Sequence, residues 1–401
     1  SAGWNDTAWA IGAVITAFLA VRYLRHSGYS TISALVNEMF GKKTSFIMVI
    51  SMCIIQSGII ALQYKAGGSI LAALLPDIFT TESGTFFSFI IFMLVAMIGG
   101  MGSVTLTNVL NLILIYVGVI VATVIVLNNH GGWAAIQTLV AAEPDVPYLS
   151  FTEGMGWIGI LSWVIVMIGN TNSVQGVVQI GLTGKYDRAA KWGYIIGAAF
   201  MVPVGFICAL LGVASKALLP DAVAAEALPR ILMSIPPVLA GITLSGLWAA
   251  DMGTGCSMIV GLATTVSSDI VYRLSGSEKL KARKSLVNKV IVVIASFITY
   301  LIATQMGAIL NAMQQALSLA IGTSFIVIGA LIAPKFTSKK AGFCTILASI
   351  VAIALWNFVP ALTGIFKSVG IFMVIVCGVV FILISAFDKD KVNVKKEFIK
   401  A

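Results

Sequence analysis

The sequence predicts an all-α membrane protein, a bundle of about eleven transmembrane helices that forms a single membrane domain over residues 1–401. Three observations support this class. Hydrophobic residues make up 59% of the chain and charged residues only 10%, which is unlike a soluble domain. Apolar runs of membrane-spanning length recur along the whole chain. Lys and Arg gather in alternate connections between those runs, as the positive-inside rule requires.

Each apolar run between polar breaks predicts one span. In chain order the runs cover residues 7–24, 44–73, 85–102, 106–128, 155–178, 190–215, 233–271, 286–304, 307–333, 341–361 and 365–387. The second and seventh runs exceed the length that a straight crossing of about 30 Å needs. We expect each of these two to tilt, to break or to extend beyond the lipid.

The basic residues predict the orientation. When the first span exits on the cytoplasmic side, every Lys and Arg lies inside except Lys65, Lys216, Arg230 and Lys367. This places residue 1 outside the cell (plasma or inner) membrane and makes residues 388–401 a basic cytoplasmic tail. The net charge of +9 then reflects topology and attraction to anionic membrane lipids, so no nucleic-acid partner is expected.

Four segments carry a more specific pattern. They are "SGYSTISALVNEMFGKK" after the first span, "GGMGSVTLTNVLN" from the third, "NSVQGVVQIGLTGKYDRAAKWG" from the fifth and "AADMGTGCS" within the seventh. In this order and at this spacing they resemble the sodium/solute symporter family. The resemblance extends over essentially the whole chain. It implies a five-plus-five inverted-repeat (LeuT-like) fold in which residues 7–333 form core helices two to ten and residues 341–387 two additional helices. Two family helices, including the first core helix, would precede residue 1.

The resemblance also implies a sodium site. Family members combine backbone carbonyls with two adjacent hydroxyls on the eighth core helix, and Gly253 and Thr254 stand at that hydroxyl pair. Thr254 is therefore retained while its partner hydroxyl is lost. We expect Na⁺ at the Ala250 carbonyl and the Thr254 hydroxyl, with Ser257 on nearly the same helix face adding an oxygen. Na⁺ is expected as the coupling ion, and no enzymatic cofactor is expected.

Asp251 and Lys65 are charged residues well inside predicted spans, where a charge costs at least about 2.5 kcal/mol. We expect the two to approach each other or to share a cavity. Asp251 alternatively holds a substrate amine, replaces a sodium ligand, carries a proton or forms a structural pair, and Lys65 alternatively reaches the outer interface.

Polar residues accompany Lys65 on the second span. Gln56 and Gln63 are seven residues apart and share one helical face, and Tyr64 lies beside them. With Asp251 these three are candidates for substrate binding, although hydrogen bonding between helices is the equal alternative.

The segment "GNTNSVQ" ends the fifth span, and its position there favours an inner gate over a binding pocket. We therefore assign Asn172 and Gln175, together with Lys65 and Gly253, to gating or structure.

These features predict a secondary transporter in which a cation gradient, most simply of Na⁺, drives uptake of a small organic solute by alternating access around a midplane site. Two alternatives stay open: proton coupling through Asp251, and a transporter-like sensor without net transport. An enzyme is not expected, because His26 and His130 fall in loops on opposite sides and no catalytic constellation is present. The expected partners are a small organic solute, Na⁺ or H⁺, and membrane lipids.

Overall fold

The computed structural model describes residues 3–18, 25–26, 28–29, 31–141, 147–223, 226–272, 283–305 and 309–393. Within them no β-strand forms beyond an isolated bridge between Ser338 and Lys391. Nine described helices are long and apolar enough to cross a membrane, or ten if the bent pair α7 (Gly156–Ser173) and α8 (Gln175–Thr183) is one span. The all-helical membrane class is confirmed, and the count of eleven stays a prediction. The ends of the predicted first span and of the basic tail lie outside the described residues.

The first described helix is α1 (Trp4–Phe18), and the next, α3 (Ile32–Phe40), is a short buried helix. The Thr31 side chain caps α3 by accepting a hydrogen bond from the Ala34 amide. Gly41 ends it with φ of 89°, a conformation that favours glycine. The chain then enters α4 (Lys42–Leu74). Its 33 residues span about 50 Å, so this helix is longer than a straight crossing, as predicted.

Helix α5 (Thr81–Asn129) reverses direction within its length, as its contacts with α11 (Pro237–Thr265) require. Ser88 accepts a hydrogen bond of 3.2 Å from the indole of Trp248, while Leu114 packs against Gly246, two residues before that Trp. In a straight helix Ser88 and Leu114 would lie about 39 Å apart. The segments Thr81–Ile98 and Asn108–Asn129 are therefore antiparallel, as the two separate predicted runs require.

Other predicted runs are divided in the structure. The long seventh run becomes α11 followed by the π-helix η1 (Val266–Tyr272), and the ninth becomes α15 (Ile309–Ser318) and α16 (Ala320–Ile332). The remaining helices are α6 (Gly132–Ala141), α9 (Asp187–Leu218), α10 (Ala227–Leu232), α14 (Lys284–Gln305), α17 (Lys339–Phe358), α18 (Ala361–Phe366) and α19 (Val369–Phe387).

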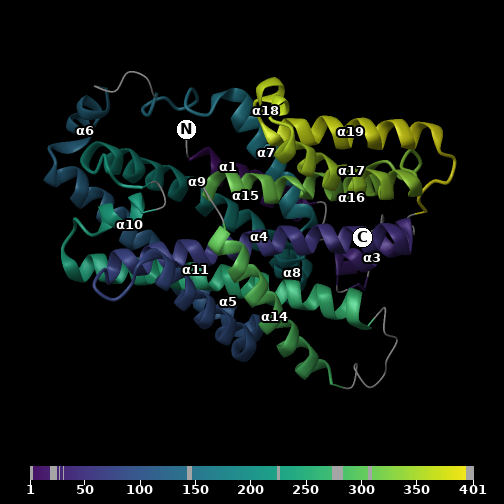
Figure 1. Ribbon diagram of the computed structural model, residues 1–401, viewed down its shortest axis with the longest axis horizontal. Coiled ribbons are helices and arrows are strands. Elements are labelled where there is room, and N and C mark those ends of the chain that lie inside the picture. Colours follow the sequence, from purple (N-terminus) through teal and green to yellow (C-terminus); the bar gives the residue numbers. More distant parts are fainter. Residues whose placement is uncertain are drawn as a thin grey trace.

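Helix α4 runs through the middle of the bundle, with α16, α17 and α19 to one side and α5, α11 and α14 to the other (Figure 1). Glycines on α4 let its neighbours approach closely. A methyl carbon added at Gly68 would lie 2.6 Å from the backbone of Thr81 in α5, so only glycine fits there. This central position makes α4 a natural wall for a polar site.

Candidate functional site

The face of α4 that carries polar side chains packs along α11, and three contacts define this seam. They join Gln56 with Gly261, Gln63 with Gly255, and Gly67 with Asp251. The prediction that Gln56 and Gln63 share a face is confirmed, because both contact the same helix. Gln56 and Asp251 nevertheless lie at opposite ends of the seam, about 16 Å apart along α4. One small solute therefore does not contact both.

Asp251 occupies the outer end of this seam, judged by the predicted orientation. Its Oδ2 atom is buried and has no hydrogen-bond partner. A methyl carbon added at Gly67 would lie 2.9 Å from this oxygen and 2.7 Å from Ser88 Oγ, so position 67 has no room for a side chain. A buried polar atom without a partner is unfavourable by about 1–3 kcal/mol, which marks Asp251 as a functional candidate.

The side chains of Lys65 and Tyr64 project from other faces of α4 than the one that packs along α11. Lys65 precedes Gly67 by two residues, which places it about 200° around the helix, on the side opposite the seam. Pairing between Lys65 and Asp251 stays a prediction, and this geometry does not favour a direct ion pair. Tyr64 is fully buried between the rings of Phe89 and Phe92, with centroids 5.8 and 5.7 Å away. Its ring packs between helices while its Oη atom is buried without a hydrogen-bond partner, so the substrate contact of Tyr64 stays a prediction.

The predicted ion-binding residues Ala250, Thr254 and Ser257 follow one another at helical spacing on one face of α11. Thr254 is exposed and Ala250 half-buried. Ser257 Oγ donates to the Thr254 carbonyl at 2.8 Å, so its lone pairs stay available. Gly253 faces Asn108, whose Oδ1 would lie 2.0 Å from a methyl carbon added there. The Asn108 side chain thus occupies the space where a Ser or Thr hydroxyl at position 253 would lie.

The membrane helix formed by α7 and α8 bends by 66° at Val174, whose backbone is extended. The side chains of Thr171, Asn172 and Ser173 donate to carbonyls four residues earlier. Such bonds offer the backbone an alternative to the helical ladder and favour a bend. The sequence reading treated this segment as the end of a span, whereas the structure places it at a bend between two buried helical pieces.

Polar atoms without partners gather at this bend. Both side-chain atoms of Asn170, the Asn172 Oδ1 atom and the Gln56 Oε1 atom are buried without a hydrogen bond. Gln56 Oε1 also lies 3.4 Å from the place of a methyl carbon added at Gly176, at the start of α8. Gln56 of α4 therefore meets α8 at Gly176 and α11 at Gly261, and a polar molecule bound there would satisfy its buried amide. The run of amides in the sequence was the signal for Asn170, which the sequence reading did not select as a binding residue.

Gln175 has a different role at the same bend. Its Oε1 atom accepts a hydrogen bond of 3.0 Å from the Ile32 amide at the start of α3. The side chain therefore joins α8 to α3 and does not point to a ligand. This geometry supports the predicted structural or gating assignment of Gln175.

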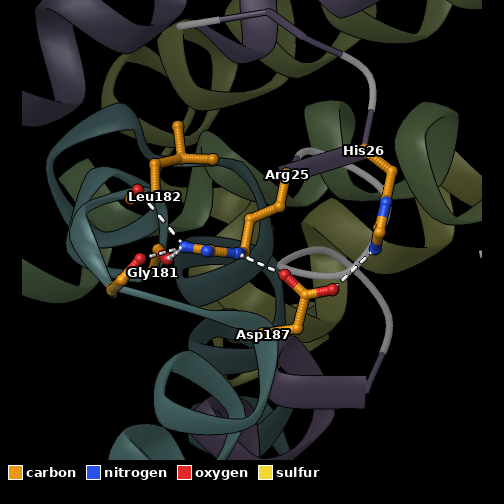
Figure 2. Close-up of polar contacts among 6 residues, drawn as sticks. Arg25, His26, Gly181, Leu182 and Asp187 are labelled. Carbon is orange, nitrogen blue, oxygen red and sulfur yellow. Dashed lines mark hydrogen bonds and ion pairs between the residues drawn. The ribbon is translucent and has the colours of Figure 1, made fainter.

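The far end of α8 is held by Arg25 (Figure 2). Its Nη1 atom donates to the carbonyls of Gly181, Leu182 and Gly184 at 2.9, 3.3 and 2.7 Å. Its Nε atom bonds Asp187 at 2.7 Å, and His26 contacts the other carboxylate oxygen at 2.6 Å. A cation is favourable at a helix C-terminus, where carbonyls lack partners. We call this group the Arg25 clasp, whereas the sequence predicts for Arg25 only a charge on the cytoplasmic side.

The oxygen chemistry of this region suits a hard monovalent cation. Among the described residues no group of three or more His, Cys, Asp or Glu side chains is placed to hold a metal ion. The available donors are hydroxyl and carbonyl oxygens on α11 and amides at the bend. Such donors match alkali cations and neutral polar solutes better than transition metals.

Comparison with known proteins gives a consistent result. The model of the sodium:solute symporter family matches residues 1–347. The structure resembles a Na⁺-coupled sialic acid symporter, solved substrate-bound in an outward-open state, with a TM-score of 0.76, 16% identity and coverage of 97% of this chain and 84% of that one. A nucleobase-cation-symport-1 family transporter, solved closed with bromovinylhydantoin bound, gives a TM-score of 0.58 at 15% identity and coverage of 96% and 84%. Both likenesses establish the transporter fold.

Proposed function

The chain belongs to the sodium:solute symporter family, and from that membership we propose that a Na⁺ gradient drives its uptake of a small polar organic solute. The protein is a multi-pass membrane transporter of the cation-coupled symport class and not an enzyme. The coupling ion, the residues that bind it and the site of the solute are the parts proposed here.

One observation carries the proposal: the bend between α7 and α8 meets the α4–α11 seam at buried amides without partners. Bent or broken membrane helices are the usual site of solutes in inverted-repeat transporters. We place the solute beside Gln56 at the bend, where the side-chain amides offer both donors and acceptors. Asn170 and Asn172 are two residues apart on α7 and face different sides of it, so the solute contacts one of them. Gln63 lies farther along the same face of α4, so the polar surface extends from Gln56 toward Asp251. Amide groups favour a solute with hydroxyl, carbonyl or amide groups at this position.

The Na⁺ ion is placed on the face of α11 that carries Ala250, Thr254 and Ser257. The Ala250 carbonyl, the Thr254 hydroxyl and the lone pairs of Ser257 supply oxygen ligands only, which is the donor set that a hard cation prefers. This face continues to Gly261, which contacts Gln56 beside the bend. Ion and solute would therefore bind to neighbouring parts of one surface, so that occupancy of one site affects the other.

The proposed organisation follows the family architecture. Residues 7–333 form core helices two to ten, residues 341–387 two further helices, and residues 388–401 a cytoplasmic tail, with residue 1 outside. Under this numbering the bent pair α7 and α8 is core helix six. The charge distribution of the chain supports the orientation.

Proton coupling is the second candidate, because the Asp251 Oδ2 atom is buried without a hydrogen-bond partner. A sensor without net transport is the third. Uptake experiments separate all three.

The test is solute uptake by the full-length protein in proteoliposomes, screened over a library of polar compounds under an imposed Na⁺ or proton gradient. Na⁺ coupling predicts that Thr254→Ala raises the half-saturating Na⁺ concentration at least about tenfold, equivalent to about 1.4 kcal/mol. The matched control is Thr264→Ala on the same helix, whose hydroxyl bonds the Val260 carbonyl and which should transport normally.

Asp251→Asn distinguishes the coupling ions. Na⁺-driven uptake that survives this change supports the proposal, whereas proton-driven uptake that it abolishes establishes the second candidate. Absence of uptake under either gradient, with every compound, contradicts transport and favours the sensor.

A further inference from the structure

A cavity of about 300 Å³ opens where α1 ends and α9 begins. Its main lining residues are Phe18, Arg25, Asp187, Arg188, Lys191 and Trp192. Three are cations, one is a carboxylate and two are aromatic. The lining is therefore positively charged on balance and is flanked by rings of the kind that lie at membrane interfaces.

The charges in this cavity are not all engaged with one another. The Asp187 carboxylate is already bonded by Arg25 at 2.7 Å and by His26 at 2.6 Å. Arg188 is exposed, and the Lys191 ammonium lies 4.0 Å above the Phe18 ring. Two cations with open donor positions therefore remain beside a neutralised carboxylate. Arg and Lys donors of this kind are the usual ligands of phosphate groups.

The start of α9 adds to the attraction for an anion. Its N-cap residue is Tyr186, which makes no side-chain capping bond. The positive end of this 32-residue helix, which carries Asp187 in its first turn, favours negative charge. The helix end therefore adds to the attraction that the cationic side chains exert on an anion.

Two apolar ridges lead away from the charged cavity. On α9 the exposed side chains Trp192, Ile196 and Phe200 follow at intervals of four residues, and on α1 the exposed Phe18, Val14 and Ile11 run the same way. The two helices pack against each other, and both ridges begin at the cavity, where Phe18 and Trp192 line it. A cationic cavity that continues into apolar ridges matches a molecule with an anionic head and hydrocarbon chains.

We propose that this cavity binds the phosphate headgroup of an anionic phospholipid, with its acyl chains along the two ridges. The charge distribution puts this end of α1 and α9 on the cytoplasmic side, where the leaflet is anionic. Arg188 and Lys191 bind the phosphate, and Trp192 and Phe18 lie at the level of the glycerol backbone. Arg25 lines the same cavity and holds the end of α8, so a bound lipid also stabilises the Arg25 clasp.

The experiment measures thermal unfolding of the purified full-length protein in detergent during titration with phosphatidylglycerol or phosphatidylcholine. Phosphatidylglycerol is expected to raise the midpoint at concentrations where phosphatidylcholine has no effect. Arg188→Gln/Lys191→Gln should require at least about fivefold more phosphatidylglycerol, or about 1 kcal/mol. The matched control, Lys42→Gln/Lys43→Gln, removes two exposed charges from the start of α4 and should respond like the unsubstituted protein.

Three results overturn the proposal: an unchanged response in the Arg188/Lys191 variant, an equal loss in the control, and a full effect of inorganic phosphate alone, which would identify a free anion as the ligand. If the double variant does not fold, Arg188→Gln alone is compared by native mass spectrometry of retained phosphatidylglycerol. Less retained lipid than in the unsubstituted protein supports the site, and equal retention refutes it.

Discussion

Gly253 and Asn108 determine together which oxygens face the proposed ion. A Ser or Thr at position 253 would supply the second hydroxyl that the family resemblance implies. In this chain the Asn108 side chain fills that space, because a methyl carbon at position 253 would lie 2.0 Å from its Oδ1 atom. The absence of a hydroxyl at position 253 and the presence of the Asn108 amide are therefore coupled. The effect of either residue on the ion site depends on the other.

This coupling predicts the effect of Gly253→Ser. The new side chain must displace the Asn108 amide, so the free energy of unfolding should fall by about 1–3 kcal/mol, as for other overpacked sites. Thermal unfolding in detergent measures the change. Gly241→Ser on the same helix is the control, since no heavy atom lies within 4 Å of a side-chain carbon there.

A second variant tests the other half of the coupling. Asn108→Ser/Gly253→Ser has room for the hydroxyl and should bind Na⁺ more tightly than Gly253→Ser. Equal stability of Gly253→Ser and Gly241→Ser would contradict the steric argument, and unchanged Na⁺ affinity in the double variant would remove position 253 from the ion site.

At the scale of elements, α8 is the piece whose position depends most on distant side chains. Gln175 ties its first residue to α3 through a bond of 3.0 Å, and Arg25 binds the carbonyls at its other end. A helix of nine residues has little stability of its own in isolation. The contacts at its two ends and the burial of its first turn therefore stabilise α8. Breaking the Arg25 clasp is the simplest change that would let α8 move.

Arg25→Gln should loosen α8 specifically. Glutamine has neither the charge nor the reach to replace the guanidinium bonds, each of which contributes about 1.5–3 kcal/mol when charged. Amide hydrogen exchange over residues 176–182 should accelerate by at least about tenfold, while exchange in α4 stays unchanged. Lys185→Gln, an exposed residue of the same connection, is the control. Unchanged exchange in Arg25→Gln, or equal acceleration in the control, would show that the clasp does not hold α8.

At the scale of the whole molecule, polar groups are arranged along one continuous wall through the bundle. The wall begins at Asp251 and Ser88, follows the α4–α11 seam and ends at the bend beside Gln56. The Arg25 clasp lies beyond that bend at the end of α8. In the orientation proposed from the basic residues, a solute entering from outside meets these features in this order.

Thiol labelling tests this orientation. Asp77→Cys, in the exposed connection between α4 and α5, should react with a membrane-impermeant maleimide in intact cells. Lys335→Cys, exposed after α16, should react only after the membrane is opened. The unsubstituted protein, with its five native cysteines, gives the background. The reverse pattern would invert the proposed topology and would place the lipid cavity in the outer leaflet.

Local pattern was sufficient for much of this protein. The all-helical membrane class, the positions of most spans and the shared face of Gln56 and Gln63 all follow from hydropathy and from 3.6-residue periodicity, which depend only on neighbouring residues. The four motifs in their order indicated the family. The same reasoning placed Thr254 and Ser257 on nearly the same face of a single helix.

The tertiary structure alone decided which helix each face meets. Periodicity orients a side chain around its own axis, but the partner is set by packing of segments far apart in the chain. The sequence separation between Arg25 and the Gly181 carbonyl is 156 residues. Asn108 and Gly253, which face each other, are separated by a similar number of residues. For that reason the Asn108–Gly253 contact and the clasp had no local signal, whereas the bend at Val174 follows a local run of Thr, Asn and Ser side chains. For the same reason the side chains of Lys65 and Tyr64, which directly follow Gln63 in the sequence, project from faces of α4 other than the seam.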